Sequence, residues 1–116
     1  MKDEMMEEII TELVANGGDA RSKALEALKA AREKDFEKAE ELLKLSDESI
    51  LRAHEFQTNL IQSVLNMESE EESYASLLMV HGQDHLMDAM VVRDLAKEML
   101  EMYRMIAELK KEHETV

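Results

Sequence analysis

The residues best suited to chemistry lie in one short segment, His81-Gly82-Gln83-Asp84-His85, with Asp88 one helical turn further on. The two histidines and two aspartates are spaced so that they share one side of a helix over two turns. An imidazole can accept a phosphoryl or acyl group on a ring nitrogen. It can also bind a divalent metal together with a carboxylate, or act as a general base beside one. The spacing alone leaves these three chemistries open.

The surroundings of this segment are unusually apolar. Between residues 77 and 90, leucine, methionine and valine occupy nearly every side of the expected helix. A helix that is apolar all round is buried all round, and two partner helices cannot cover it completely. Either another copy of the chain or a docking protein is therefore expected to pack against this stretch.

The polar residues within it differ in what they predict. His85 falls on the core-facing stripe and is expected to be mainly a hydrogen-bonded core histidine, whereas His81 lies at the edge, where it can meet a partner. Gly82 indicates either close helix packing or room for a phosphoryl group or an approaching protein. Asp84 has no Lys or Arg within a helical turn. If copies of the chain met along this face, their Asp84 carboxylates would converge and require a hard divalent ion. His54, on another helix, is interpreted as structural.

The elements that position these residues are predicted to be helices only. The chain of 116 residues has no proline, no cysteine and three glycines, so it lacks the turn residues that a sheet requires. Apolar residues make up 45% and aromatic residues 3%, which indicates an aliphatic core. A single domain over residues 1–116 is expected, with no disulfide and no thiolate metal site.

Hydrophobic periodicity predicts an antiparallel three-helix bundle. The first helix is expected to be one long element that is interrupted, by a break or a kink, at Gly17-Gly18 and restarted by Asp19, with Leu25 and Leu28 on its inner face. A turn is expected at residues 33–35, with Asp35 as the N-cap of the second helix, and a second link at residues 68–72. The expected inner stripe of the second helix is Phe36, Ala39, Leu43, Ser46, Ile50, Ala53, Gln57, Leu60 and Val64, and that of the third is Leu78, Gly82, His85, Ala89, Val92, Ala96, Met99, Tyr103 and Ile106.

The charge restricts the partners. The formal net charge of −13 disfavours nucleic acid and anionic membrane surfaces, whereas a basic protein partner is compatible with it. The N-terminal residues lack the basic start and apolar run of a signal peptide, and no apolar run is long enough to span a bilayer. A cytoplasmic location is therefore expected.

Residues 79–87, Met-Val-His-Gly-Gln-Asp-His-Leu-Met, resemble the phosphorylation motif of the enzyme IIA components of lactose/cellobiose-type sugar phosphotransferase systems. The resemblance extends over most of the chain. Residues 18–22, 27–28 and 30–31 are similar to the first helix of that family, and residues 35–36, 53–54 and 57–58 to its second. The chain departs from the family at Asp88, where a threonine is common, and in the acidic link 66–72, which lacks the usual glycine.

This resemblance implies a homotrimer and a phosphocarrier. His81 would accept a phosphoryl group from the histidine-containing phosphocarrier HPr and pass it to a cysteine of the IIB component during uptake of a disaccharide through the membrane IIC component. Asp84 would bind one Mg²⁺-like ion jointly with its copies, and His85 and Gln83 would support the site. The sugar stays open among lactose, cellobiose, chitobiose and other disaccharides. The alternative is a non-catalytic, metal-stabilised trimeric scaffold or regulatory paralogue, which would not depend on phosphorylation of His81.

Overall fold

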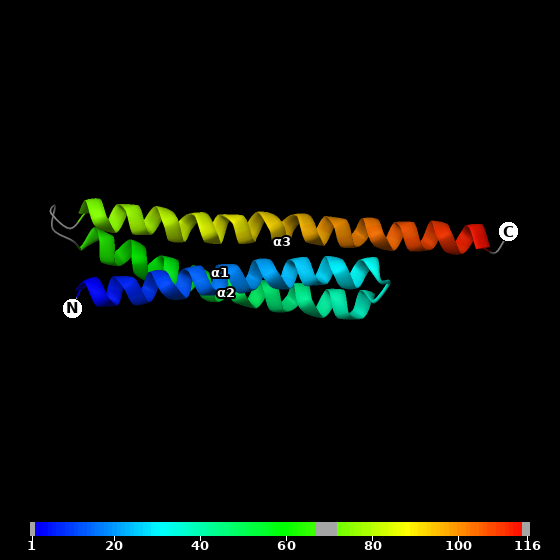
Figure 1. The fold of residues 1–116 in the computed structure, drawn as a ribbon, viewed down its shortest axis with the longest axis horizontal. Coiled ribbons are helices and arrows are strands. Elements are labelled where there is room, and N and C mark those ends of the chain that lie inside the picture. Colours follow the sequence, from blue (N-terminus) through cyan, green and yellow to red (C-terminus); the bar gives the residue numbers. More distant parts are fainter. Residues whose placement is uncertain (1, 67–71, 115–116) are drawn as a thin grey trace.

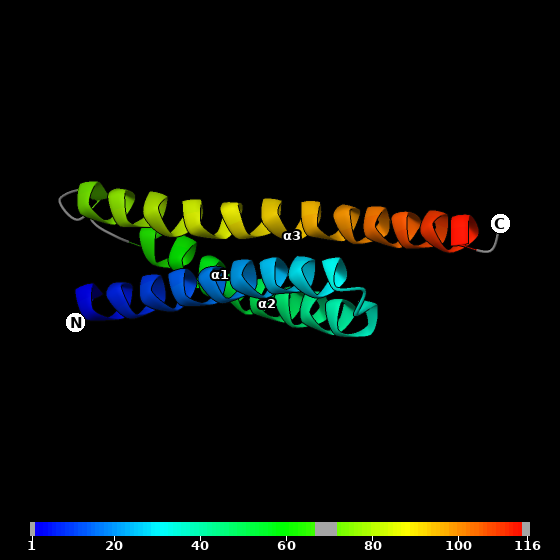
Figure 2. The ribbon, with the colours of Figure 1, turned by 45° about the vertical axis from the view of Figure 1, so that its right-hand side comes forward.

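Three long helices form the described part of the chain. The computed structural model describes residues 2–66 and 72–114, which contain α1 (Lys2–Arg32), α2 (Phe36–Leu65) and α3 (Glu72–Glu114) and no strand. Figures 1 and 2 show α1 and α3 running in the same direction, with α2 antiparallel to both. The prediction of an all-α, antiparallel three-helix bundle is confirmed.

The prediction that the first helix is interrupted at Gly17-Gly18 is wrong. α1 continues through both glycines, and neither has a positive φ. Tertiary contacts explain the continuity, because packing on an amphipathic face outweighs the weak helix propensity of glycine. Ser46 Oγ donates a hydrogen bond to the carbonyl oxygen of Ala20 at 2.7 Å, and Ser49 Oγ donates one to Asp19 Oδ2 at 2.6 Å. Asp19 therefore joins α1 to α2 rather than capping a second helix.

The first turn was predicted correctly. α1 ends at Arg32, Lys34 adopts a left-handed conformation with φ of 66°, and α2 begins at Phe36. Asp35 is the N-cap, since its Oδ1 accepts a hydrogen bond from the backbone N–H of Lys38 at 3.2 Å. The second predicted link, residues 68–72, lies outside the described residues except for its last, Glu72, which begins α3.

The core follows the predicted stripe of α2 closely. Of that stripe, six residues are buried and Phe36 and Gln57 are half-buried, while the side chain of Val64 is not described. On α1, Leu28 packs against the core as expected, whereas the expectation for Leu25 is wrong because 45% of its surface is exposed.

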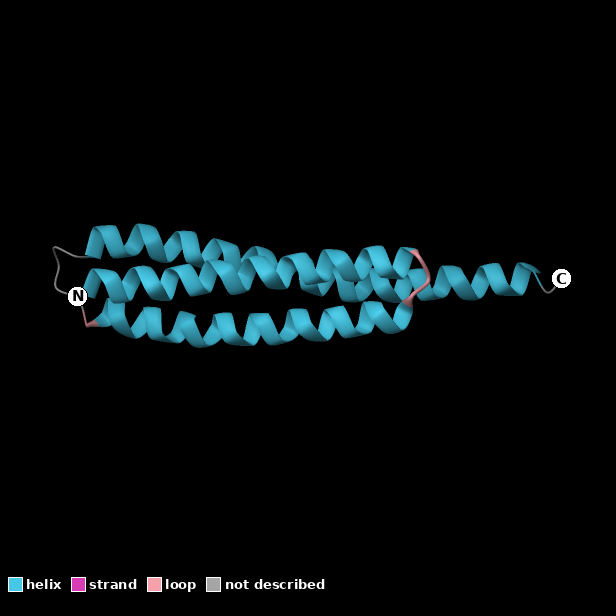
Figure 3. Cartoon of the chain, turned by 60° about the horizontal axis from the view of Figure 1, so that its bottom comes forward, coloured by secondary structure: helices cyan, strands magenta, loops and turns pink. Residues whose placement is uncertain are grey.

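The predicted stripe of α3 is correct only in part. Gly82, Ala89 and Ala96 are buried, but Met99 and Ile106 are 40% and 53% exposed. The buried leucines that complete the observed face are Leu86 and Leu100. Figure 3 shows that α3 continues past the ends of the other two helices, so its C-terminal part has no helix of its own chain to pack against.

Charged side chains join α2 to the flank of α3 that faces it. Asp47 Oδ1 accepts a hydrogen bond from Arg93 Nη1 at 3.1 Å, and Asp47 Oδ2 accepts one from Lys97 Nζ at 3.0 Å. Further along, Arg104 pairs with Glu40. This flank of α3 is therefore occupied by contacts with α2, and the opposite flank faces α1.

Candidate functional site

The two histidines of the motif lie one helical turn apart on α3 and contact each other. Their ring centroids are 4.8 Å apart, and the ring planes meet at 77°, an edge-to-face arrangement. His81 is exposed and His85 is half-buried. A ring that is open to solvent on one side and supported on the other by a second imidazole is suited to exchange a group with a docking protein.

Gly82 is explained by packing. A Cβ atom at this position would lie 2.6 Å from Cδ2 of Leu13, which is fully buried on α1. The missing side chain therefore allows α1 and α3 to approach closely beneath the histidines. Of the two interpretations of Gly82 in the sequence, the structure supports close helix packing.

A groove of about 520 Å³ runs between α1 and α3 beside His85. α1 contributes two glycines and two polar side chains to it, and α3 contributes polar and apolar residues. The lining residues are Gly17, Gly18, Arg21, Ser22, His85, Asp88, Val91 and Val92. The groove therefore combines a cation, an imidazole and a carboxylate.

Arg21 and Ser22 have no role that the sequence predicts, although both lie in the segment 18–22 that is similar to the first helix of the family. The parallel packing of α1 on α3 brings these residues to His85. A signal for this packing is present in the glycines, because Gly17 lies against the backbone of His85 and Gly82 lies against the side chain of Leu13.

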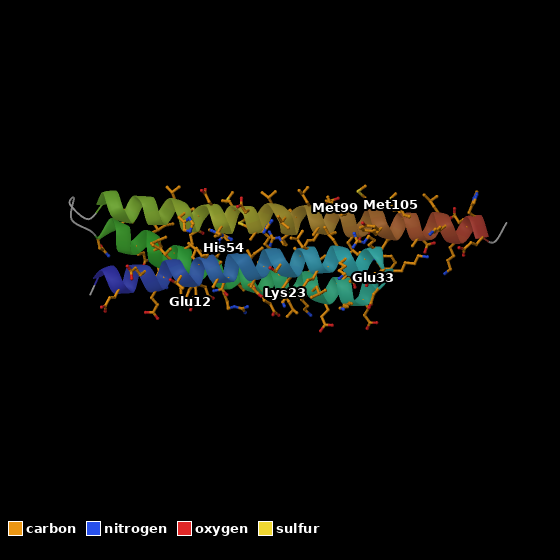
Figure 4. All side chains as sticks on the ribbon, viewed as in Figure 1. Glu12, Lys23, Glu33, His54, Met99 and Met105 are labelled. Atoms are coloured by element: carbon orange, nitrogen blue, oxygen red, sulfur yellow. The ribbon has the colours of Figure 1, made fainter. Side chains whose placement is uncertain are left out.

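Gln83 lies on the other flank of α3. Gln57 Nε2 donates a hydrogen bond to Gln83 Oε1, and Gln57 Oε1 lies 3.0 Å from His54 Nδ1. Positions 81 and 83 differ by roughly 200° around a helix, so this chain of hydrogen bonds faces α2 and not His81. His54, labelled in Figure 4, is half-buried in a polar contact between α2 and α3, which agrees with its predicted structural role.

Asp84 lies within a stripe of exposed apolar residues along α3, which we call the α3 stripe. Its apolar members are each more than half exposed: Val80, Met87, Val91, Leu95, Met102, Ile106 and Leu109. The Asp84 side chain is itself exposed and has no ion pair with any described residue. Within residues 2–66 and 72–114, no group of three or more histidine, aspartate or glutamate side chains could hold a metal ion in one chain.

These features define a class of protein. It is a small helical bundle in which an exposed histidine, supported by a second histidine, lies on the same helix as a long exposed apolar stripe. Comparison with known proteins identifies the family. The family described as "PTS system, Lactose/Cellobiose specific IIA subunit" matches residues 8–104. The chain belongs to this family, whose members are IIA components of the sugar phosphotransferase system.

Individual relatives agree. The chain is 45% identical over 106 residues to the lichenan-specific phosphotransferase enzyme IIA component of Bacillus subtilis, covering 91% of this chain and 94% of that protein. It is similar to the cellobiose-specific enzyme IIA of Bacillus anthracis, with a TM-score of 0.76, 39% identity and coverage of 89% and 92%. It is also similar to a chain of the IIA(chitobiose)–HPr complex of Escherichia coli, with a TM-score of 0.75, 35% identity and coverage of 88% and 96%.

None of the helices in the described ranges is long and apolar enough to cross a membrane.

Proposed function

We propose that this chain is a cytoplasmic phosphocarrier that accepts a phosphoryl group from phospho-HPr on His81. It then passes the group to a cysteine of a IIB component, which phosphorylates a disaccharide such as cellobiose, chitobiose or lactose as the sugar enters through a membrane IIC component. Family membership supports this proposal, and so does the HPr-bound state of one similar solved protein. The observation that carries the choice of residue is the exposed His81 ring resting edge-on against His85.

The transfer requires positioning and charge control more than covalent work by the protein. A ring nitrogen of neutral His81 would attack the phosphorus in line with the bond that breaks. His85 would support the ring and donate a hydrogen bond to the phosphoryl oxygens. Gln83 faces α2, so its contribution would be to hold α3 against α2 and not to touch the phosphoryl group.

We also propose that three copies assemble along the α3 stripe. An exposed apolar face of this length is unfavourable in water, and parallel copies would cover it in all three chains. Three Asp84 carboxylates would then meet near the symmetry axis, where their mutual repulsion favours one divalent ion, for which Mg²⁺ suits the oxygen ligands. A single chain supplies one carboxylate to such a site.

The experiment that tests the phosphocarrier is incubation with phospho-HPr. His81→Ala is expected to abolish transfer of label while leaving the helical circular dichroism unchanged. His113→Ala is the matched control, because His113 is also an exposed histidine on α3 and lies far from the motif. Acid-labile label on the His81 variant would contradict the assignment.

The same assay distinguishes the phosphocarrier from the second candidate function, a non-catalytic trimeric scaffold or regulatory paralogue. The length of the α3 stripe favours an assembly role whatever the chemistry. A scaffold would form the same trimer but would take no label from phospho-HPr. Normal assembly together with no phosphoryl acceptance by the unmodified chain would therefore decide for the scaffold.

A further inference from the structure

The groove between α1 and α3 contains a cation with no protein partner in the described part of the chain. Arg21 is exposed, and no hydrogen bond or ion pair joins it to any residue in 2–66 or 72–114. Asp88 lines the same groove but forms no ion pair with it. In a chain with a net charge of −13, an arginine without a carboxylate partner is the feature that an anionic ligand would use.

The register of the two helices directs this cation toward the histidines. α1 and α3 run in the same direction, and a Cβ atom at Gly17 would lie 3.2 Å from the carbonyl oxygen of His85, so these two positions are at the same level. Arg21 lies one turn further along α1. Helical side chains slope back toward the N-terminus of their helix, so the guanidinium can return to the level of His85.

His85 connects the groove to the proposed phosphorylation site. Its side chain lines the groove, and its ring lies 4.8 Å from the ring of His81. On the α1 side the groove is open at Gly18, where an added Cβ would meet nothing within 4 Å. At Gly18 the α1 side of the groove therefore has no side chain that would obstruct an anion between His85 and Arg21.

We propose that Arg21 binds the phosphoryl group that His81 carries, donating hydrogen bonds from its guanidinium to the phosphoryl oxygens. This inference rests on the proposed phosphocarrier function. In the transfer itself, the phosphorus–nitrogen bond on the donor histidine breaks as the bond to His81 forms, and the electron pair stays on the donor ring. Arg21 changes no bond. Its planar guanidinium matches two oxygens at once and stabilises the phosphorylated protein relative to the free protein.

Asp88 is expected to have the opposite effect to Arg21 on the stability of the phosphorylated protein. Asp88 lines the same groove from the α3 side, so its carboxylate faces the anion that Arg21 would bind there. Like charges at close range destabilise each other, so Asp88 lowers the stability of the phosphorylated state. The balance between Arg21 and Asp88 then sets how readily His81 keeps or releases its group.

The test measures the equilibrium constant for phosphoryl exchange between HPr and this protein, together with the rate of hydrolysis of the phosphohistidine. Arg21→Gln is expected to lower the constant about tenfold, the usual effect of losing a hydrogen bond to a charged group, and to speed hydrolysis. Arg21→Lys should fall between this variant and the unmodified protein. Asp88→Asn should raise the constant several-fold.

The matched control is Arg32→Gln. Arg32 is an exposed arginine on the same helix, roughly 16 Å further along at helical rise, and does not line the groove. Equal constants for Arg21→Gln and Arg32→Gln would overturn the inference, as would a lower constant for Asp88→Asn. If the unmodified chain accepted no phosphoryl group, both proposals would fail, whereas a normal unmodified chain with an indifferent Arg21 would remove this inference alone.

Discussion

The three glycines of this chain all lie inside helices, yet they serve different purposes. Glycine costs about 1 kcal/mol of helix stability relative to alanine in a helix interior. A glycine there is therefore favourable only where a larger side chain would clash with a neighbour. An added Cβ would lie 2.6 Å from Leu13 at Gly82 and 3.2 Å from the His85 backbone at Gly17, and would meet nothing at Gly18. Gly82 and Gly17 are therefore required by helix packing, whereas Gly18 is not.

Alanine substitutions should reveal this order in unfolding by urea at a fixed protein concentration. Gly18→Ala is expected to raise the free energy of unfolding by up to about 1 kcal/mol, because it gains helix propensity without a clash. Gly82→Ala is expected to lower it by about 1–3 kcal/mol, because Leu13 is fully buried and cannot move aside freely. Gly17→Ala should fall between them. Stabilisation by Gly82→Ala, or a loss at Gly18, would contradict these contacts.

At this scale the sequence predicts the site in part. The spacing of His81 and His85 places them on one side of a helix, and the structure has their rings in contact. That Gln83 points away from His81 also follows from helical geometry, whereas its contact with Gln57 of α2 is known only from the structure. The role of Arg21 could not, because it depends on which helix packs beside α3 and in which direction, and neither follows from periodicity within one helix.

At the scale of elements, the continuity of α1 depends on its contacts with α2. Ser46 and Ser49 are both fully buried, and their hydroxyl groups bind Ala20 and Asp19 on α1. Arg52 extends the contact by donating hydrogen bonds to Ser49 Oγ and Asn16 Oδ1. These bonds hold α1 against α2 on either side of the glycine pair.

Removing one of these hydroxyls should weaken the bundle. Ser46→Ala is expected to lower the free energy of unfolding by about 1 kcal/mol, because it deletes a buried hydrogen bond to Ala20. Thermal or urea unfolding measures the loss. Ser22→Ala, an exposed serine of α1, serves as control and should change stability by less than about 0.5 kcal/mol. Equal effects of the two substitutions would show that the buried bond contributes nothing.

The buried faces of α2 and α3 show how much of the packing hydrophobic periodicity can predict. The stripe of α2 was predicted almost completely because both of its neighbours pack on one face. On α3 the prediction drifted onto Met99 and Ile106, since apolar residues occur on both the packed face and the α3 stripe. The break at Gly17-Gly18 was a wrong prediction for a related reason. Local propensity favours it, but contacts with Ser46 and Ser49, distant in sequence, decide against it.

At the scale of the whole molecule, one chain leaves a long apolar face of α3 exposed. The α3 stripe runs from Val80 to Leu109, and α3 continues past the ends of α1 and α2 (Figure 3). Two further exposed methionines of α3, Met99 and Met105, are labelled in Figure 4. The opposite side of α3 is occupied by α1 and α2. Burial of the stripe between copies would leave the histidines at its edge, open to HPr and to the IIB component.

The proposed trimer has a measurable mass, three times the 13.3 kDa of one chain. Val91→Glu, in the stripe, is expected to reduce the mass measured by light scattering toward that of one chain, because buried glutamates would repel each other and lose hydration. The control is Leu51→Glu, at an exposed leucine of α2, which should leave the mass unchanged. A trimeric Val91 variant would exclude the α3 stripe as the assembly surface.

Substitutions at Asp84 test metal binding separately from trimer formation. If one divalent ion neutralises three carboxylates, a chelator should loosen the unmodified trimer, because repulsion between the carboxylates returns when the ion leaves. Asp84→Leu removes both the charges and the need for an ion, so this variant should remain trimeric, bind no metal by elemental analysis, and become insensitive to the chelator. Asp84→Asn, which keeps the size but not the charge, should also lose chelator sensitivity. Metal retained at one ion per three chains in the leucine variant would place the ion elsewhere, and Asp84 would then be a polar residue that the stripe tolerates because its side chain reaches water.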